Sequence, residues 1–362
     1  NAGDDLQAIK KGVMEIADLI VINKVDLDPD AAMRAQLFIT SSLRLLGFQG
    51  NPEHASHDKD FWHPTVMTMS ALEGKGIPEL WDKVTHFQSL QRSNGKFDIQ
   101  VFPASSLGKE TDINQGLTLG TVDIIISGPS FAARTYPRFG IAYYPFLFRD
   151  GDHLLAYAKS TLFQEMVNEF RGKTGIQVTA YTYYGARHTS AQKPFTNCDG
   201  VKGLKIRVPD VPAYTATWQA CGANPTPIAF AEVYLALQNG TVDAQENPLT
   251  TIEAKKFFEV QKAIMLTGHI VDGLITMVGP HVWANLSPAE QKMFSDVMQE
   301  AAARASAKIK KRESELIDTF KKKGLSVVDV NRKSFQEAVL KNKTVESLGL
   351  QRADFDRVQA LK

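Results

Sequence analysis

The chain has 362 residues, with 41 basic and 40 acidic side chains, a formal net charge of +1, 43% hydrophobic residues and 22% charged residues. This composition is typical of a folded globular protein and excludes the disordered, collagen-like and fibrous classes. The near-neutral charge argues against a nucleic-acid partner, and no apolar run reaches the ~18–20 residues of a membrane span. At this length, two or more domains are expected.

The charge is unevenly distributed along the chain. Residues 1–95 carry 9 Lys+Arg against 13 Asp+Glu, a balance of −4, whereas residues 96–362 carry 32 against 27, a balance of +5. The pattern of apolar runs also changes near residues 93–98. We therefore expect two domains, 1–95 and 96–362. The chain opens with an acidic Asn-Ala-Gly-Asp-Asp, where a secretory signal is basic, so no signal peptide is predicted.

The first domain alternates helices and short apolar strands. The predicted order is a helix over Asp4–Ala17, a strand over Leu19–Ile22, a helix over Pro29–Leu46, a strand over Val66–Met69 and a helix over Ile77–Phe87. The first strand is apolar throughout, as in a strand buried on both faces. This alternation predicts a parallel sheet covered by helices.

Two polar loops follow these strands, Asn23-Lys24-Val25-Asp26 and Ser70-Ala71-Leu72. A carboxylate such as Asp26 can accept protons from both the ring N–H and the exocyclic amine of guanine, a donor pair that adenine lacks. The loops resemble the guanine-recognition motifs of GTPases. Residues 1–26 and 71–81 resemble the MeaB/ArgK family, GTPase chaperones of cobalamin-dependent mutases. The resemblance implies a nucleotide-binding remnant of Asn23, Lys24, Asp26, Ser70 and Ala71.

Sequence motifs for catalysis are missing. No Gly-x-x-x-x-Gly-Lys-[Ser/Thr] occurs, so no phosphate-binding loop can be named, and base contacts alone cannot hydrolyse GTP. There is no Gly-x-Ser-x-Gly elbow, and neither cysteine lies in a nucleophile motif. We therefore predict that the chain is not an enzyme and has no cofactor.

Three histidines, His54, His57 and His63, lie close together in the sequence. Their spacing matches no closed zinc site and no cysteine is nearby. We interpret them as solvated loop residues and predict no metal site.

The second domain is a longer series of strands and helices. Strands are predicted over Ile99–Val101, Val122–Ile126, Ile176–Tyr183, Leu204–Val208 and Ile275–Val278. Helices are predicted over 152–171, 212–221, 230–239, 250–260 and 287–324. The last opens with Ser287-Pro288-Ala289-Glu290, which combines a serine cap, a first-turn proline and a carboxylate three residues after the cap.

Four ordered motifs resemble the DctP-type substrate-binding proteins of TRAP transporters. They are Phe102-Pro103-x-x-x-Leu107-Gly108, Gly203–Pro209, Gly222–Pro227 and Phe230–Gln238 leading into Val242–Pro248. The resemblance implies an α/β fold with two lobes closing around an organic acid, preceded here by a partial parallel α/β GTPase fragment. The family's first strand and helix have no counterpart, so we expect an exposed apolar sheet edge.

The resemblance makes Arg207 the anchor of a ligand carboxylate. A buried strand ending in arginine places a flat, two-pronged donor in a dry environment, where bidentate pairing with a carboxylate is strong. On the residues alone, a structural salt bridge is an equal alternative. The resemblance implies further binding residues: Arg187 as a second arginine, Asn247 as an amide and Phe230 as an apolar wall. Asp210 and Ser127 are implied in loops that face the cleft, and His188 either bonds a ligand hydroxyl or is structural.

The implied ligand is a small carboxylate. Residues 183–189 resemble family members that bind sugar acids such as glucuronate or galacturonate, so a hexuronate is favoured, while a C4-dicarboxylate, a sialic acid or another hydroxy acid remains open. The implied partners are the membrane permease subunits of a TRAP transporter. A receptor of this family is periplasmic, whereas the chain as written, without a signal peptide, is expected in the cytoplasm.

The sequence leaves two questions open. Cys198 and Cys221 are either a disulfide, worth about 3 kcal/mol in the chain-entropy model, or two free buried thiols. The alternatives to an organic-acid receptor are a MeaB/ArgK-like guanine-nucleotide-binding fragment and a chimera of two truncated proteins with neither activity.

Overall fold

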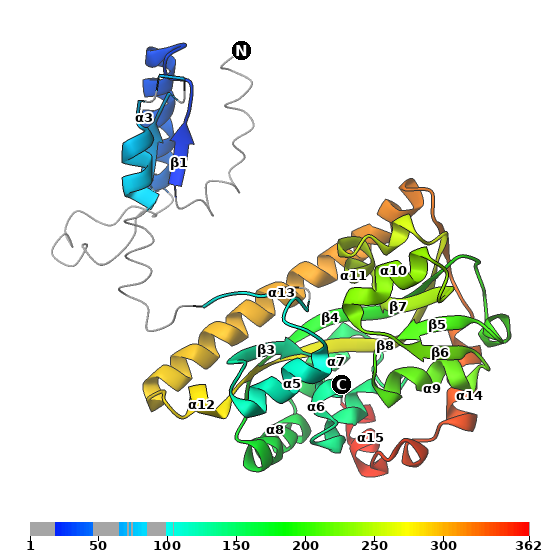
Figure 1. Cartoon of the computed structure of the whole chain (residues 1–362). Coiled ribbons are helices and arrows are strands. Elements are labelled where there is room, and N and C mark those ends of the chain that lie inside the picture. The colour runs from blue at the N-terminus through cyan, green and yellow to red at the C-terminus, as the bar shows by residue number, and fades with distance from the viewer. Residues whose placement is uncertain are drawn as a thin grey trace. The chain divides into compact units, whose positions relative to one another are not determined.

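The computed structural model describes residues 19–45, 65–70, 72–73, 75–84, 99–103 and 105–361. The chain forms two compact units, Asn1–Val101 and Phe102–Lys362 (Figure 1). This division lies six residues beyond the expected one at 95/96.

The first unit contains a two-stranded sheet and its covering helix. Strands β1 (Leu19–Ile22) and β2 (Thr65–Thr68) pair in parallel, and helix α3 (Pro29–Leu45) connects them in sequence. Ile39 of α3 is 1% exposed and packs on Val66 of β2. A further helix covers residues 77–84. The expected parallel β-α pattern is confirmed here, and the predicted helix Asp4–Ala17 lies outside the described residues.

A seven-stranded mixed sheet forms the frame of the second unit. Its order is β3-β8-β4-β7-β5-β6, with β9 also paired to β8. The strands are β3 (Ile124–Ser127), β4 (Gln177–Ala191), β5 (Lys205–Val208), β6 (Asn224–Pro227), β7 (Ala244–Pro248), β8 (Ala263–Val278) and β9 (Ser326–Val328).

The long strands β4 and β8 are shared by two half-sheets (Figure 1). β3 pairs with the carboxyl-terminal end of β8, and β7 pairs with the carboxyl-terminal end of β4 and, on its other edge, with β5. The register of β4 against β8 shifts between Tyr183 and Gly185, between these two regions, and again between Arg187 and Thr189, where β7 begins to pair. These irregularities bend the strands where one half-sheet passes into the other.

Helices cover both half-sheets. They are α5 (Glu110–Leu119), α6 (Pro129–Ala132), α7 (Gly151–Lys159), α8 (Thr161–Thr174), α9 (Pro212–Ala220), α10 (Val233–Gln238), α11 (Leu249–Ala254), α12 (Pro280–Trp283), α13 (Pro288–Lys322), α14 (Arg332–Asn342) and α15 (Arg352–Gln359). The predicted capping box of α13 is confirmed, because Ser287 and Glu290 exchange side-chain-to-backbone hydrogen bonds. α13 packs along β4, and Ser306 Oγ accepts a 2.9 Å hydrogen bond from the Tyr183 N–H.

Three predicted elements are wrong. The helix predicted over 250–260 ends at Ala254, and a separate 3₁₀ turn covers Phe257–Glu259, because Lys256 between them is in the left-handed conformation with a φ of 55°. Residues 99–103 form no strand, and Ile99 and Val101 are 56% and 79% exposed; no described strand pairs with them, and a strand needs such pairing. The helix predicted over 152–171 is two helices, because Ser160 is extended and its hydroxyl caps α8 by accepting from the Phe163 N–H.

The expected apolar edge is present at β3. Among the described residues, β3 ends the strand order, and its Ile126 is 61% exposed. Leu119, at the end of the preceding helix α5, is 77% exposed. Ile126 is therefore apolar surface on a strand that has a partner strand on one side only among the described residues.

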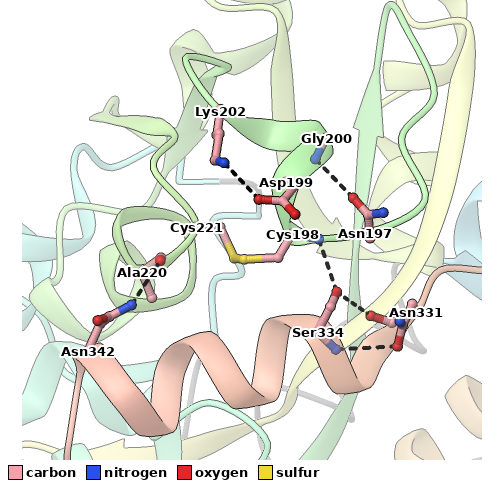
Figure 2. The surroundings of a disulfide bond; sticks show 10 residues. All are labelled: Asn197, Cys198, Asp199, Gly200, Lys202, Ala220, Cys221, Asn331, Ser334 and Asn342. Atoms are coloured by element: carbon pink, nitrogen blue, oxygen red, sulfur yellow. Dashed lines mark hydrogen bonds and ion pairs between the residues drawn. A yellow bond between two sulfur atoms is a disulfide. The ribbon is translucent and has the colours of Figure 1, made fainter.

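Cys198 and Cys221 form a disulfide with a Cα–Cα distance of 5.2 Å. Figure 2 shows the bridge beside α14, whose first turn holds Ser334 and whose last holds Asn342. The Cys198 N–H donates to Ser334 Oγ at 3.0 Å, and Asn342 Nδ2 donates to the Ala220 carbonyl at 3.3 Å. The disulfide therefore links the two chain segments on which α14 rests.

Candidate functional site

Three strands point their carboxyl ends at the middle of β4 and β8. β3 runs along β8 until Ser127 lies opposite Ile275, while β7 runs along β4 until Pro248 lies opposite Arg187. β5 is parallel to β7. Because β3 approaches from one half-sheet and β5 and β7 approach from the other, their following loops meet at the centre of the unit. In α/β folds, ligands bind outside the carboxyl ends of strands.

Arg187 lies at this centre and is 3% exposed. Its guanidinium donates from Nε and Nη2 to the two carboxylate oxygens of Glu246, at 2.5 and 2.8 Å, and from Nη1 to Asp272 at 2.7 Å. The Cζ atom of Arg187 lies over the ring of Tyr214, 4.8 Å from the ring centre. Burial by itself raises the pKa of Glu246, but the charge of Arg187 and the hydrogen bonds from His269 and Arg187 together outweigh burial, so the pKa falls below its ordinary value. Arg187 thus joins β4, β7 and β8 through internal ion pairs.

Arg207, at the end of β5, has a different environment. It is 2% exposed, and its Nε and Nη2 both donate to the Ile228 carbonyl, at 2.9 and 2.7 Å. Within the described part of the chain, no carboxylate forms an ion pair with it. Burial lowers its pKa to about 10, against the opposing influence of Glu246, so it remains protonated at neutral pH. A buried cation held only by a carbonyl is poised to bind an anion.

Three other predicted residues lie around the same strand ends. Asn247 accepts from Arg187 Nη2 at 3.2 Å and donates to Gln245 at 2.6 Å. Ser127 is buried at the end of β3, with Asn114 Nδ2 at 3.5 Å. Phe230 is half-buried, and Lys255 Nζ lies 5.0 Å from its ring centre.

Asp210 and His188 make specific contacts with the protein. Asp210 is exposed and pairs with Arg134 at 2.8 Å. His188 Nδ1 accepts from the Gly268 N–H at 3.1 Å, which fixes a neutral ring. Burial, helped by the neighbouring His269 and Arg332, lowers the pKa of His188 to about 3. The ligand roles of these two residues stay predictions.

Several residues of the centre were missed in the sequence. Asp272, Tyr214 and Glu246 are not among the site residues predicted from the sequence. His269 Nε2 lies 3.0 Å from Glu246 and extends the buried cluster. The sequence does carry a signal for Asp272, which is a charged residue inside the apolar run Ile270–Met277. A buried carboxylate requires a cationic partner, so this position indicates an internal ion pair.

In the first unit, the two predicted guanine-recognition loops come together. Ser70 Oγ donates to Asp26 Oδ1 at 2.5 Å, and the Lys24 N–H donates to the Asn23 side chain at 2.8 Å. Lys24 has a φ of 64°, the left-handed conformation of a tight loop. Ala71 lies outside the described residues.

Neither a metal centre nor a membrane helix is found in the described segments. They contain no group of three or more His, Cys, Asp or Glu side chains placed to hold a metal ion. No helix in them is long and apolar enough to cross a membrane. His54, His57 and His63 lie outside the described residues.

A pair of half-sheets whose strand ends converge on a buried arginine is the architecture of a two-lobed solute receptor. The family model of DctP, bacterial extracellular solute-binding protein family 7, matches residues 67–345. The chain belongs to this family of TRAP solute-binding proteins. The family model of the methylmalonyl-CoA mutase-associated GTPase MeaB matches residues 1–105. Both resemblances seen in the sequence are thereby confirmed, and the two matches overlap over residues 67–105.

Individual relatives support the receptor assignment. The sialic acid-binding periplasmic protein SiaP of Vibrio cholerae is 33% identical, over 69% of this chain and 78% of that protein. The 2,3-diketo-L-gulonate-binding periplasmic protein YiaO of Escherichia coli is 34% identical, over 69% and 76%. A TRAP periplasmic solute-binding protein from Roseobacter denitrificans with bound L-galactonate has a TM-score of 0.69 at 30% identity, covering 76% of this chain and 90% of that one.

Proposed function

We propose that residues 102–362 are the receptor for a sugar acid, which they deliver to the membrane permease of a TRAP transporter. The observation that carries this proposal is the buried guanidinium of Arg207, which is held by the Ile228 carbonyl and has no carboxylate partner among the described residues. A ligand carboxylate supplies the missing negative charge through a bidentate, charge-assisted pair.

The polar groups near Arg207 favour a ligand with several hydroxyls. Asn247 and Ser127 lie at the ends of β7 and β3 and can each donate to or accept from a hydroxyl. The relatives named above bind sialic acid, diketogulonate and L-galactonate, each with a carboxylate and several hydroxyls. We propose a hexuronate as the preferred member of this class and the periplasm as the place of binding.

A titration-calorimetry panel tests the ligand class. It contains D-glucuronate, D-galacturonate, L-galactonate, a sialic acid and the C4-dicarboxylate succinate, each against the full chain. The proposal expects binding of at least one sugar acid, with a hexuronate tightest and succinate weakest. Binding of succinate alone, or of no acid, would overturn it.

A guanine nucleotide is the second candidate ligand, for the first unit. The contact between Asp26 and Ser70 favours it, because it presents a fixed carboxylate at the end of β1 as guanine recognition requires. We propose base binding without hydrolysis, in a chimera of two families. GDP and ADP in the same panel test this: equal affinity, or none for GDP, would exclude guanine recognition.

A further inference from the structure

An exposed ion pair links the loops that follow β3 and β5. Arg134 lies just beyond α6, and Asp210 lies two residues beyond β5. Arg134 Nη2 donates to the Asp210 backbone carbonyl at 2.7 Å and to its carboxylate at 2.8 Å. One guanidinium nitrogen therefore fixes both the main chain and the side chain of Asp210.

The two residues belong to different half-sheets. Arg134 follows β3, which pairs with the carboxyl-terminal end of β8, whereas Asp210 follows β5, which reaches β4 through β7. The half-sheets are joined by β4 and β8, whose register is irregular on either side of Gly185. Gly185 has a φ of 130°, which L side chains rarely adopt. A bend in this region changes the distance between Arg134 and Asp210.

The strength of the pair suits reversible contact. The side chains of Arg134 and Asp210 are 48% and 62% exposed, so both remain hydrated when they separate. An exposed pair of this kind changes an equilibrium constant by a factor of about 1.4 to 5. The ion pairs of Arg187 differ in this respect, because that side chain is 3% exposed and separating it from Glu246 would leave a buried charge unpaired.

We propose that Arg134 and Asp210 form a latch that stabilises the closed arrangement of the two half-sheets around the ligand. Asp210 acts on Arg134 in this arrangement and not on the ligand. The latch slows ligand release and leaves association unchanged, because it forms after the ligand has entered. This inference rests on the proposed receptor function and adds to it the groups that hold the closed state.

Stopped-flow kinetics with D-galacturonate test the latch. The variants are Arg134→Ala, Asp210→Ala, the double alanine variant and the exchange Arg134→Asp with Asp210→Arg. The latch predicts a release rate about 2- to 5-fold higher in Arg134→Ala and a smaller rise in Asp210→Ala, where Arg134 keeps its bond to the backbone carbonyl of residue 210. The double variant should rise no further than Arg134→Ala, the exchange should restore the rate in part, and about 0.5 M NaCl should reduce the differences.

Arg352→Ala is the matched control. Arg352 pairs with Glu346 at 2.8 Å with the same 48% side-chain exposure, but both residues lie in the carboxyl-terminal segment. Its release rate is expected to equal that of the wild type. If Asp210→Ala weakens binding while Arg134→Ala does not, Asp210 contacts the ligand and the latch is wrong. Equal rates in all variants would also overturn it.

A ligand-free measurement separates failure of the latch from failure of the receptor proposal. Spin labels on Leu119→Cys in α5 and Gln238→Cys in α10 report the separation of the half-sheets, since both positions are exposed. Pulsed dipolar spectroscopy should show a smaller closed fraction in Arg134→Ala than in Arg352→Ala. That result without binding of any sugar acid in the calorimetry panel would support the latch and refute the proposed ligand class. Identical distance distributions would refute the latch itself.

Discussion

At the scale of single residues, the guanidinium geometry of Arg207 matters more than its charge. Its Nε and Nη2 share the Ile228 carbonyl, which leaves the rest of the planar fork for a carboxylate. Arg207→Lys keeps a positive charge but cannot satisfy the carbonyl and a bidentate ligand together. We expect the dissociation constant of the sugar acid to rise by about 30-fold or more.

Titration calorimetry measures this change, and Arg171→Lys serves as the control because Arg171 is an exposed arginine of α8. Circular dichroism should show both variants folded. An affinity within about threefold of the wild type in Arg207→Lys would mean that another cation binds the carboxylate.

His188 gives a prediction about pH. Its pKa is about 3 in the folded chain, against 6.5 for an unperturbed histidine, so between these values the unfolded chain binds more protons. The stability contributed by the neutral ring is therefore present above pH 6.5 and is lost as pH falls toward 3. The slope from this group is at most about 1.4 kcal/mol per pH unit. His188→Gln, whose side-chain oxygen can still accept from Gly268, should flatten the pH dependence of urea unfolding; an unchanged slope would show that other groups dominate.

The sequence indicated single residues where a local motif carried them. Arg207, Asn247 and Phe230 lie in continuous motifs, and the structure places them at neighbouring strand ends. The ion pairs of Arg187 with Asp272 and Glu246 were not predictable, because they join positions 85 and 59 residues apart. Such contacts depend on the strand order, which no local pattern specifies.

At the scale of elements, the disulfide makes the clearest prediction. Cys198 and Cys221 are 23 residues apart in the sequence, and their disulfide closes a loop that contains β5 and α9. Replacing both cysteines by serine should lower the free energy of unfolding of the second unit by about 3 kcal/mol. Urea denaturation measures this, and reduced wild-type protein should lose a similar amount. If dithiothreitol leaves the wild-type transition unchanged, the bridge either does not form in solution or does not stabilise the fold.

Elements marked by local signals, such as apolar runs and capping residues, were predicted well. β1, β5 and α13 lie within one or two residues of their expected bounds, since buried runs and a serine cap are local signals. β4 and β8 are much longer than expected. Their polar and small residues, such as Arg187 and Gly273, interrupt the apolar pattern, and their pairing across both half-sheets supplies the order that the local sequence does not.

At the scale of the whole molecule, the two units have separate cores. Ile39 and Val66 form a small cluster in the first unit, whereas large clusters containing Trp218 and Phe320 form in the second. A protein built this way unfolds in more than one transition, so a single melting temperature does not describe it. A ligand of the second unit adds stability only to the transition that destroys its own site.

We therefore expect a sugar acid at about 100 times its dissociation constant to stabilise the second unit by about 2.7 kcal/mol and the first unit not at all. Hydrogen-exchange mass spectrometry measures the stability of the two units separately, because β1 and β2 yield different peptides from β4, β5 and β7. Protection should rise in peptides of the second unit and stay constant in β1 and β2. GDP gives the reciprocal control, since its proposed contact is Asp26. If the acid protects both units equally, they fold as one cooperative body, and the division after Val101 has no thermodynamic meaning.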